Sequence, residues 1–360
     1  MPNPQSKLLI NLSFLISQPT GLAIYAKNLF PHLKSLNPTL LTAENFPNSN
    51  CYQIPANLTP EQGTKGHINR LLWTQTQIPK IYKQLKSNLL FSPIPEAPLF
   101  TNCRYIITVH DLIALRFPRR FDPLTPYHKY YIPQVLRQAQ HVICDSESTA
   151  KDIADFCKIP SSLISPIFPG YDANFFRFLD LPTSNYFLYM GRHNPHKNVQ
   201  RVVAAFAALP DNSEYELWIT GSADKRYTPL LKAQVQELGL FDRVKFLDYL
   251  PAADLPKVIN RAIALVFPSL WEGFGLPVLE AMACGTPVIT SNLSSMPEVA
   301  GDSAWLVNPY SVPEIAAAMH ELATDAKVRS HLRELGLARA KLFSWEKTGR
   351  ETAAILDQYL

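Results

Sequence analysis

The sequence predicts an α/β fold made of two Rossmann-like, doubly wound domains that face each other across a cleft. The chain has 360 residues, which exceeds the size at which one hydrophobic core stops growing. Short apolar runs alternate with segments of helical spacing over short loops, which is typical of a parallel sheet covered on both faces. The stretch 166–182 holds prolines and a glycine but no periodicity, so we place the domain boundary there.

The second half shows this alternation most clearly. Gly239 follows a helical segment and is predicted as its C-cap. We predict strands at 186–190, 216–220, 244–247, 263–267 and 288–290, and helices at 198–209, 228–238, 253–260 and 277–283.

The first half follows the pattern less regularly. We predict strands at 8–12, 105–109 and 141–144 and helices at 22–33 and 149–156. Ser146 and Ser148 are candidate caps for the last helix. Residues 41–70 are polar and irregular and receive no element.

Composition narrows the class of protein. Hydrophobic residues make up 47% and charged residues 18%, which suits a globular protein. No apolar run reaches the ~18 residues of a membrane span, and the N-terminus lacks the features of a signal peptide. The five cysteines are odd in number and scattered, so we expect no disulfide framework or zinc site and a cytoplasmic location.

Charge is unevenly distributed. Residues 1–180 hold 17 Lys and Arg against 11 Asp and Glu, a net of +6, whereas the remainder holds 17 against 19, a net of −2. The basic half favours an anionic partner or the inner face of a membrane, and ordinary surface scatter is the alternative. We expect no nucleic-acid partner.

A first group of candidate site residues follows the strand 186–190. Gly191 and Arg192 come at its carboxyl end, and Lys197 lies where the next helix begins. A cation at a helix N-terminus is locally unfavourable unless an anion lies nearby. Arg192 offers a fork for phosphate oxygens and Lys197 a point charge, so a diphosphate fits between them. The alternative is two solvated loop cations.

A second group lies in the segment PSLWEGFGLPVLEAMACGTPVIT. Glu272 precedes a turn of Gly273, Phe274 and Gly275, and Pro277 suits the first helical position. The amides of Phe274, Gly275 and Leu276 then point from a helix N-terminus, which is an anion site.

Two carboxylates flank that anion site. Glu280 is expected in the first helical turn, and both Glu272 and Glu280 can accept hydrogen bonds from sugar or ribose hydroxyls. The alternative is a helix-dipole partner for Glu280 and a solvated loop position for Glu272.

His110 and Asp111 end the strand 105–109, where an open α/β sheet faces its ligand. His110 either meets the donor sugar or acceptor or is a satisfied structural histidine, and Asp111 either orients His110 or caps the following turn. The sequence contains no Asp-x-Asp and no cluster of oxygen ligands, so we expect a metal-independent site without a cofactor.

These residues resemble a known family. The E-x7-E arrangement in EGFGLPVLEAMACGTPVI, preceded by YMGRHNPHKN, is similar to that of the family-4 retaining glycosyltransferases of GT-B fold. TVHDL, HVICDSESTAKDI, PGYDANFF, FLDYLPAADLPKV, SSMPEVAGDSAWLVNP and FSWEKT resemble further family segments in the same order. The most similar subgroup contains mannosyltransferase-like enzymes that build polysaccharides.

The resemblance implies roles for these residues. Arg192 and Lys197 would bind the diphosphate, Glu272 the donor-sugar hydroxyls, with the backbone of 273–276, and Glu280 the ribose. His110 would touch the donor sugar near the reacting carbon, and 247–250, including Leu250, would border the base.

The resemblance also implies a reaction and a domain plan. The donor would be GDP-mannose or a UDP-sugar, the acceptor a glycan or lipid-linked sugar, and the anomeric configuration would be retained. Residues 1–175 would form the acceptor domain and 176–344 the donor domain. Residues 345–360 would form a helix that crosses back to the first domain.

The chain departs from the family in its first loop, which holds one glycine, Gly21, and no arginine. Gly21 can still present its backbone to the donor. The segment 115–121 (LRFPRRF) mixes arginine with aromatic residues and predicts either a peripheral membrane or anionic-acceptor contact, or a packed loop. Two rival functions remain, namely a sugar-nucleotide epimerase or hydrolase and a catalytically silent nucleotide-sugar binding subunit.

Overall fold

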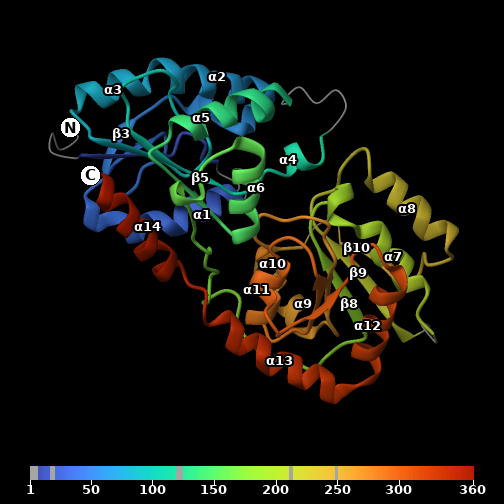
Figure 1. Cartoon of the computed structure of the whole chain (residues 1–360). Helices are drawn as coiled ribbons and strands as arrows, with labels where there is room; N and C mark the ends of the chain where they lie inside the picture. Colours follow the sequence, from blue (N-terminus) through green and yellow to red (C-terminus); the bar gives the residue numbers. More distant parts are fainter. Residues whose placement is uncertain (1–6, 17–20, 119–124, 211–213, 248–249) are drawn as a thin grey trace. The chain divides into compact units, whose positions relative to one another are not determined.

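A computed structural model describes residues 7–16, 21–118, 125–210, 214–247 and 250–360 (Figure 1). The chain divides into two compact units. Unit 1 comprises Met1–Gly170 and Ser344–Leu360, and unit 2 comprises Tyr171–Phe343. The chain therefore leaves unit 1 a few residues before the boundary expected at 175/176.

Unit 1 is built on a seven-stranded parallel sheet of order β3-β2-β1-β4-β5-β6-β7. Ile10 of β1 pairs with Leu40 of β2 on one side and Phe91 of β4 on the other. The inner strands are buried along their length because helices cover both faces of the sheet. The strands are β1 (Leu8–Asn11), β2 (Thr39–Thr42), β3 (Asn50–Gln53), β4 (Leu89–Ser92), β5 (Tyr105–Val109), β6 (His141–Cys144) and β7 (Ile164–Pro166).

Alternate strand residues supply two separate cores. Leu8 and Ile10 pack in a cluster with α1 (Gly21–Leu29), the 3-10 helix η1 (Phe30–Leu36) and α14 (Trp345–Tyr359). Leu9 belongs to the opposite cluster. The other helices of unit 1 are α2 (Gly63–Thr76), α3 (Ile78–Gln84), α4 (Ile113–Arg116), α5 (Ile132–Gln138) and α6 (Glu147–Cys157), with a π-helical turn η4 (Tyr127–Tyr131) and 3-10 turns η2 (Ala56–Leu58), η3 (Pro60–Gln62) and η5 (Ser161–Leu163).

Several predictions for unit 1 are confirmed and others are incomplete. The strands β1, β5 and β6 lie where expected, and Ser146 caps α6 by accepting a hydrogen bond from the Thr149 amide. The helix expected over 22–33 ends as an α-helix at Leu29, because Pro31 lacks the N–H that would continue the ladder. The unassigned segment 41–70 contains β3 and the start of α2.

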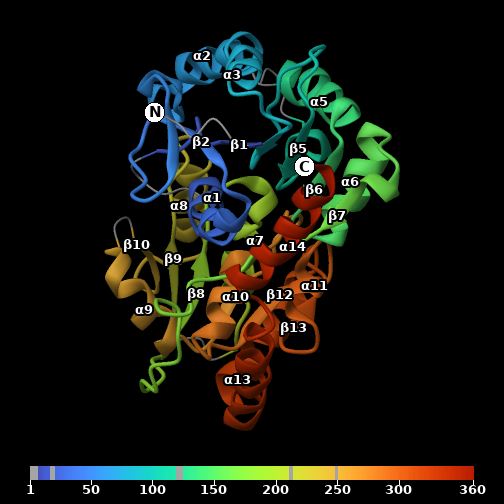
Figure 2. The same cartoon turned by 90° about the vertical axis from the view of Figure 1, so that its left-hand side faces the viewer.

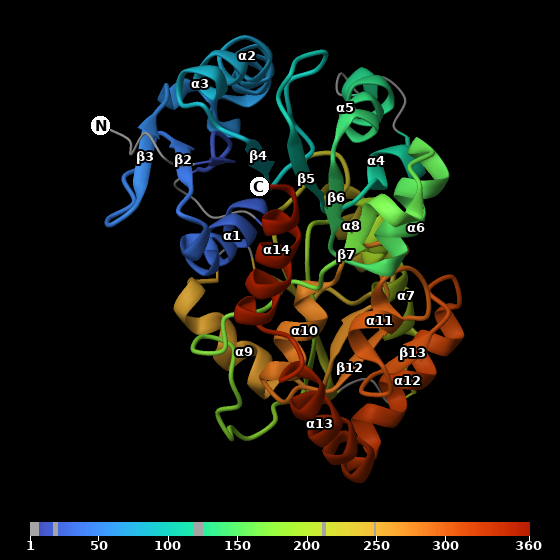
Figure 3. The same cartoon turned by 60° about the vertical axis from the view of Figure 1, so that its left-hand side comes forward.

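The C-terminal segment packs on unit 1. Figure 3 shows α14 beside α1, and the Asn88 side chain donates a hydrogen bond to the Leu360 carbonyl. Gly170 lies so close to the start of this segment that an added Cβ would stand 2.2 Å from the Trp345 nitrogen. The two places where the chain leaves and re-enters unit 1 are therefore adjacent.

Unit 2 is built on a six-stranded parallel sheet of order β10-β9-β8-β11-β12-β13 (Figure 2). Its strands are β8 (Tyr186–Met190), β9 (Glu216–Thr220), β10 (Val244–Leu247), β11 (Leu265–Phe267), β12 (Val288–Ser291) and β13 (Trp305–Val307). Its helices are α7 (Val199–Ala207), α8 (Thr228–Glu237), α9 (Leu255–Arg261), α10 (Leu276–Ala283), α11 (Met296–Ala300), α12 (Val312–Thr324) and α13 (Ala326–Ala340), with 3-10 turns η6 (Pro195–Lys197) and η8 (Ala252–Asp254).

The predicted elements of unit 2 are all present, with shifts of a few residues at their ends. Gly239 has a φ of +67° after α8, and the Leu240 amide donates back to the Val235 carbonyl, which confirms the predicted C-cap. β13 and the helices α11, α12 and α13 were not predicted.

Candidate functional site

The candidate donor residues of unit 2 follow two neighbouring strands. β8 pairs with β11 in parallel, so the loops after them meet at one edge of the sheet. The first loop carries Gly191, Arg192 and Lys197, and the second carries Glu272. The two loops are joined directly, because the Leu270 amide donates to the His196 carbonyl at 2.7 Å.

Lys197 and Glu272 form the centre of this site. The Lys197 ammonium lies 2.7 Å from each carboxylate oxygen of Glu272 and 5.6 Å from the centroid of the Phe267 ring. Only 20% of the Lys197 side chain and 9% of the Glu272 side chain are exposed. The anion that compensates Lys197 in this structure is thus a carboxylate of the protein itself.

Serine hydroxyls fix the position of Glu272. The Ser269 hydroxyl donates to its carboxylate at 2.6 Å. The Glu272 amide donates to Ser294, whose hydroxyl donates back to the Glu272 carbonyl. Ser295 donates to the carbonyl of Phe274. None of these serines was predicted as a site residue, and a serine in a loop carries little signal for such a role.

Two buried polar side chains hold the loop that carries Lys197 in place. The amide nitrogen of Asn198 donates to the carbonyls of Pro268 and Pro309. The Tyr189 hydroxyl donates weakly to the carbonyls of Arg192 and Lys197, at 3.3 and 3.4 Å. A tyrosine within a predicted buried strand is a usable signal, because its hydroxyl requires a partner.

Arg192 differs from Lys197 in its surroundings. It is exposed, and its guanidinium has no hydrogen-bond or ion-pair partner among the residues that the structure describes. The structure therefore holds Lys197 in place and leaves Arg192 available to an anionic ligand.

The N-terminus of α10 lies directly after Glu272. Gly275 is its N-cap with a φ of +122°, and an added Cβ would stand 2.4 Å from the Met296 methyl group. The amides of Gly275 and Leu276 have no hydrogen-bond partner within the described parts of the chain. Such amides are donors for an anion.

Glu280 was placed in the first turn of this helix, and that prediction is wrong. α10 begins at Leu276, so Glu280 lies in the second turn, beyond the strongest field of the helix N-terminus. The carboxyl is partly buried, and loss of hydration raises its pKa to about 7. A carboxyl that titrates near neutrality is common at functional sites.

Glycines line the carboxyl ends of β8 and β9. Gly191 has a φ of +154° and donates to the Thr220 carbonyl, and Gly221 has a φ of +132°. An added Cβ on Gly221 would stand 2.2 Å from the Gly191 carbonyl oxygen. Gly221 was missed, although its place after a strand matches that of Gly191. Leu250 is half-buried after β10, and residues 248–249 lie outside the described residues.

In unit 1, His110 follows β5 and is held from two neighbouring strand ends. Its Nδ1 lies 2.7 Å from an Asp145 carboxylate oxygen, and its Nε2 donates to the Pro93 carbonyl at 2.8 Å. Burial opposes the charged ring, but the Asp145 carboxylate outweighs this and raises the pKa of His110. Both ring nitrogens are thus engaged within unit 1. Asp111 caps the next turn by accepting from the Ile113 amide.

The other candidates of unit 1 are less constrained. Gly21 is the exposed first residue of α1, and an added Cβ would meet nothing within 4 Å. In the segment 115–121, Arg116 pairs with the buried Asp152 and stacks over Phe156, as a packed loop requires. Residues 119–121 lie outside the described residues.

Among the described residues, no group of three or more His, Cys, Asp or Glu side chains could hold a metal ion. Within the same residues, no helix is both long and apolar enough to cross a bilayer.

Comparisons with protein families match nearly the whole length of the chain. Residues 172–338 match the model described as "Glycosyl transferases group 1", and residues 19–175 match "Glycosyltransferase Family 4".

Curated relatives are 29% and 34% identical to this chain over the aligned residues. It is 29% identical over 269 residues to O-antigen chain mannosyltransferase B of Escherichia coli, covering 69% of each protein. It is 34% identical over 213 residues to O-antigen chain mannosyltransferase RfbU of Salmonella typhimurium, covering 59% of this chain and 58% of that protein. The match spans only 33% of the serotype-specific mannosyltransferase WbdA of Escherichia coli.

Solved structures share the fold at low identity. Sucrose-phosphate synthase from Thermosynechococcus elongatus has a TM-score of 0.78 at 21% identity, with 98% of both chains covered. Anabaena HepE in complex with UDP and glucose has a TM-score of 0.76 at 17% identity, covering 98% of this chain and 100% of that one.

Proposed function

Because the chain belongs to the family-4 glycosyltransferases of GT-B fold, we propose that it moves mannose from GDP-mannose to a glycan acceptor in polysaccharide biosynthesis. A UDP-sugar is the second choice of donor. The observation that carries the donor half of this proposal is the Lys197–Glu272 pair, which lies just before the N-terminus of α10. The mannosyltransferase names of the curated relatives support the choice of sugar.

The leaving diphosphate is the group for which unit 2 has the most donors. Arg192 supplies a free guanidinium, Lys197 an ammonium, and Gly275 and Leu276 supply backbone amides. Fixed donors aimed at developing charge stabilise a transition state because they need no reorganisation during the reaction. These groups all act on the phosphate oxygens. None of them is a base that would activate water, so the set suits transfer of the sugar better than hydrolysis.

Glu272 and Glu280 have separate roles in the proposal. The carboxylate of Glu272, fixed by Ser269 and Lys197, accepts hydrogen bonds from hydroxyls of the transferred sugar. Glu280 accepts from the ribose. The proposed transfer retains the anomeric configuration through front-face attack, with the leaving diphosphate taking up the acceptor proton.

His110 contributes charge in this scheme and transfers no proton. Its Nδ1 and Nε2 already bond Asp145 and Pro93, which keeps the imidazolium in one orientation. In the family that the chain resembles, a residue at this place meets the donor sugar, and a fixed positive ring favours negative charge on oxygen atoms.

The acceptor is proposed to be a glycan or a lipid-linked sugar, and the enzyme is proposed to contact a membrane surface. Because Arg116 already pairs with Asp152, α2 is the better candidate for the membrane contact. Ile68 and Leu72 lie one turn apart on that helix and are 51% and 61% exposed. Apolar side chains presented in this way can enter the headgroup region.

A thermal-shift series with GDP-, UDP- and ADP-sugars tests the donor. Binding to the native state raises Tm by mass action, and a ligand at 100 times its Kd stabilises by about 2.7 kcal/mol. We expect GDP-mannose to give the largest increase in Tm. An equal response to all three nucleotides, or none, would contradict the proposed donor.

A further inference from the structure

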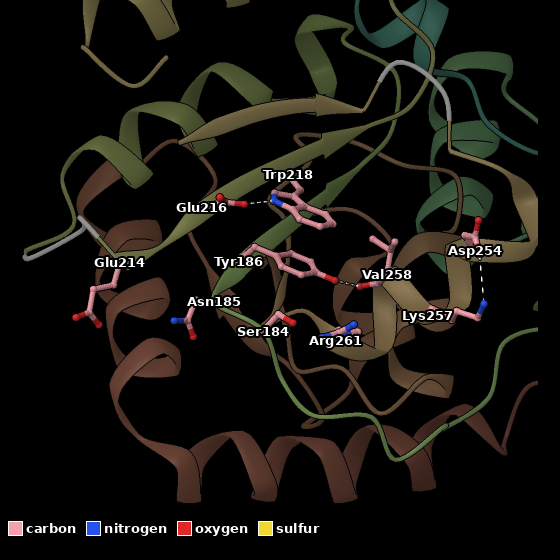
Figure 4. A pocket seen from close by; sticks show the side chains of 10 residues that line it. All are labelled: Ser184, Asn185, Tyr186, Glu214, Glu216, Trp218, Asp254, Lys257, Val258 and Arg261. Carbon is pink, nitrogen blue, oxygen red and sulfur yellow. Dashed lines mark hydrogen bonds and ion pairs between the residues drawn. The ribbon is translucent and has the colours of Figure 1, made fainter. Parts of the chain in front are cut away.

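Unit 2 contains a hollow of about 540 Å³ at the end of its sheet opposite the candidate donor residues (Figure 4). It is lined by residues at or just before the amino ends of β8 and β9 and by residues of α9. The candidate donor residues follow the carboxyl ends of β8 and β11. β8 has five residues and spans about 17 Å, so this hollow is separate from the candidate donor site.

Two stacked aromatic rings form one wall of the hollow. Tyr186 and Trp218 lie parallel, with ring centroids 3.9 Å apart and an angle of 4° between their planes. The Tyr186 hydroxyl donates to the Val258 carbonyl at 2.7 Å, and the Trp218 indole N–H donates to Glu216 at 2.6 Å. Tyr186 is buried, whereas part of Trp218 stays exposed. The indole is therefore a rigid apolar surface that costs little conformational entropy when a ligand packs on it.

Uncommitted polar groups surround this wall. The side chains of Asn185, Glu214 and Arg261 are exposed and make no hydrogen bond or ion pair with the part of the chain that the structure describes. They come from two strand ends and one helix end, and Figure 4 shows Arg261 beside Tyr186, with Asn185 and Glu214 farther along the hollow and the Glu214 side chain turned away from the rings. Together they offer an amide, a carboxylate and a guanidinium, which can donate to and accept from hydroxyl groups.

The charge of the hollow selects among possible ligands. Two of its three carboxylates are paired, Asp254 with Lys257 at 3.4 Å and Glu216 with Lys245 at 2.6 Å. The other two charged residues of the lining, Glu214 and Arg261, are of opposite sign. The hollow therefore carries little net charge, which suits a neutral polyol better than a nucleotide diphosphate. A volume of this size accommodates a small ligand.

We propose that this hollow is a second carbohydrate-binding site, in which one pyranose unit of the glycan chain packs on Trp218 while hydroxyls of this and adjoining units bond Arg261, Asn185 and Glu214. The axial C–H groups give a pyranose an apolar face, and the electron-rich face of an indole attracts such groups. The occupant rests on the proposed function, because it is the acceptor or product glycan of the transfer. A chain held here stays near the enzyme between transfers, which raises its effective concentration.

Calorimetry and NMR on the full chain, saturated with GDP, test this site. The probe is a series of unbranched mannose oligosaccharides of increasing length. We expect binding to perturb the indole N–H resonance of Trp218, assigned by its loss in Trp218→Phe. We expect Trp218→Ala to weaken binding about tenfold. Because Trp218→Ala removes a stacked ring and risks misfolding, the exposed pair Asn185→Ala with Glu214→Ala provides a second variant with the same expected loss.

Two controls separate this site from the donor site. Phe241 is 78% exposed in the same unit and does not line the hollow, so Phe241→Ala should leave oligosaccharide binding unchanged. Glu272→Gln should abolish transfer and leave the Trp218 perturbation intact. If the wild-type enzyme transfers no sugar but oligosaccharide still perturbs the Trp218 resonance, the proposed function fails and the second site stands.

Other outcomes overturn the second site alone. One is transfer to long acceptors that is equally efficient in the wild type and in the Asn185→Ala/Glu214→Ala variant. A second is a Trp218 resonance that shifts with GDP and not with oligosaccharide. A third is a dimer, seen as a mass that depends on protein concentration, in which the hollow is buried and closed to a glycan.

Discussion

At the scale of single residues, the candidate donor site depends on the ion pair between Lys197 and Glu272. Lys197 and Glu272 are both largely buried and bonded to each other. Removing one partner of such a pair leaves an uncompensated charge, which costs about 3–5 kcal/mol. Stability and activity can therefore be separated by removing one partner or both.

We expect Lys197→Met to lower both stability and activity, and Lys197→Met with Glu272→Gln to restore stability only. Loss of one fixed donor to the diphosphate should reduce kcat about 10²- to 10³-fold. Urea denaturation and steady-state kinetics measure the two effects. The exposed Lys327 provides the control, and Lys327→Ala should change neither. Recovery of activity in the double variant would show that Lys197 acts only as a structural partner.

Glu280 gives the site a dependence on pH. Burial raises the pKa of its carboxyl to about 7, above the ordinary 4.5. A raised pKa means that the folded state holds the proton more tightly than the unfolded state, so stability is lost as pH rises from 4.5 through 7. We expect Glu280→Gln to raise Tm by a few degrees at pH 8 and to have no effect at pH 4. Differential scanning calorimetry at both pH values measures this, and an equal change at both would be contrary evidence.

The stability contribution of His110 also falls as pH rises, but for a different reason. Although burial opposes the charged ring, Asp145 raises the pKa of His110 above 6.5. The stabilisation is complete below pH 6.5 and is lost as pH rises through the folded-state pKa. Asp145→Asn should therefore destabilise the protein more at pH 5.5 than at pH 9, and NMR titration should show a lower pKa for His110. An unchanged His110 pKa would rule out this electrostatic role.

At the scale of elements, the N-terminus of α10 depends on one glycine. Gly275 has a φ of +122° and faces the Met296 methyl group, so a side chain there is strained and also collides. Gly239 offers a matched comparison, because its φ is +67° and an added Cβ meets nothing within 4 Å. We expect each alanine variant to cost about 1–3 kcal/mol of stability.

Only Gly275→Ala should also weaken binding of the nucleotide diphosphate, since it displaces the amides of Gly275 and Leu276. Titration calorimetry with GDP on both variants, at a temperature where both are folded, distinguishes the two cases. Equal GDP affinity in Gly275→Ala and wild type would remove α10 from the proposed site.

The elements also show what the sequence could predict. Apolar runs bounded by turns were sufficient for β5, β6, β8 and β9, because these strands are buried on both faces or bounded by clear loops. β3 is partly exposed at a sheet edge, so the polar run 50–53 carried no such signal. Glu280 was placed in the first turn because the predicted helix began at Pro277, one residue after the observed start at Leu276, which depends on the backbone of Gly275.

The same limits apply to the site. Glycines and charged residues after strands indicated Gly191, Lys197 and Glu272, since those positions face a ligand in α/β sheets. The direct pairing of Lys197 with Glu272 could not be predicted. It depends on β8 and β11 being neighbours, although 75 residues separate the two side chains along the chain.

At the scale of the whole molecule, each unit has its own parallel sheet and its own core, and the chain passes between them at Gly170 and Ser344. The family predicted from the sequence is confirmed by matches to both halves of the chain. The fold prediction is likewise confirmed, because the similar solved structures are glycosyltransferases of GT-B architecture. The epimerase, hydrolase and silent-subunit alternatives differ from the proposed activity in the fate of the donor sugar.

The most direct test follows that sugar from a labelled donor. GDP-mannose labelled at the anomeric carbon is incubated with the enzyme and an unbranched mannose oligosaccharide, and the products are read by NMR. We predict label in the oligosaccharide with retained anomeric configuration, and none after replacement of both Arg192 and Lys197 by alanine. Label recovered as free or epimerised sugar, an inverted linkage, or full transfer by the double variant would contradict the account.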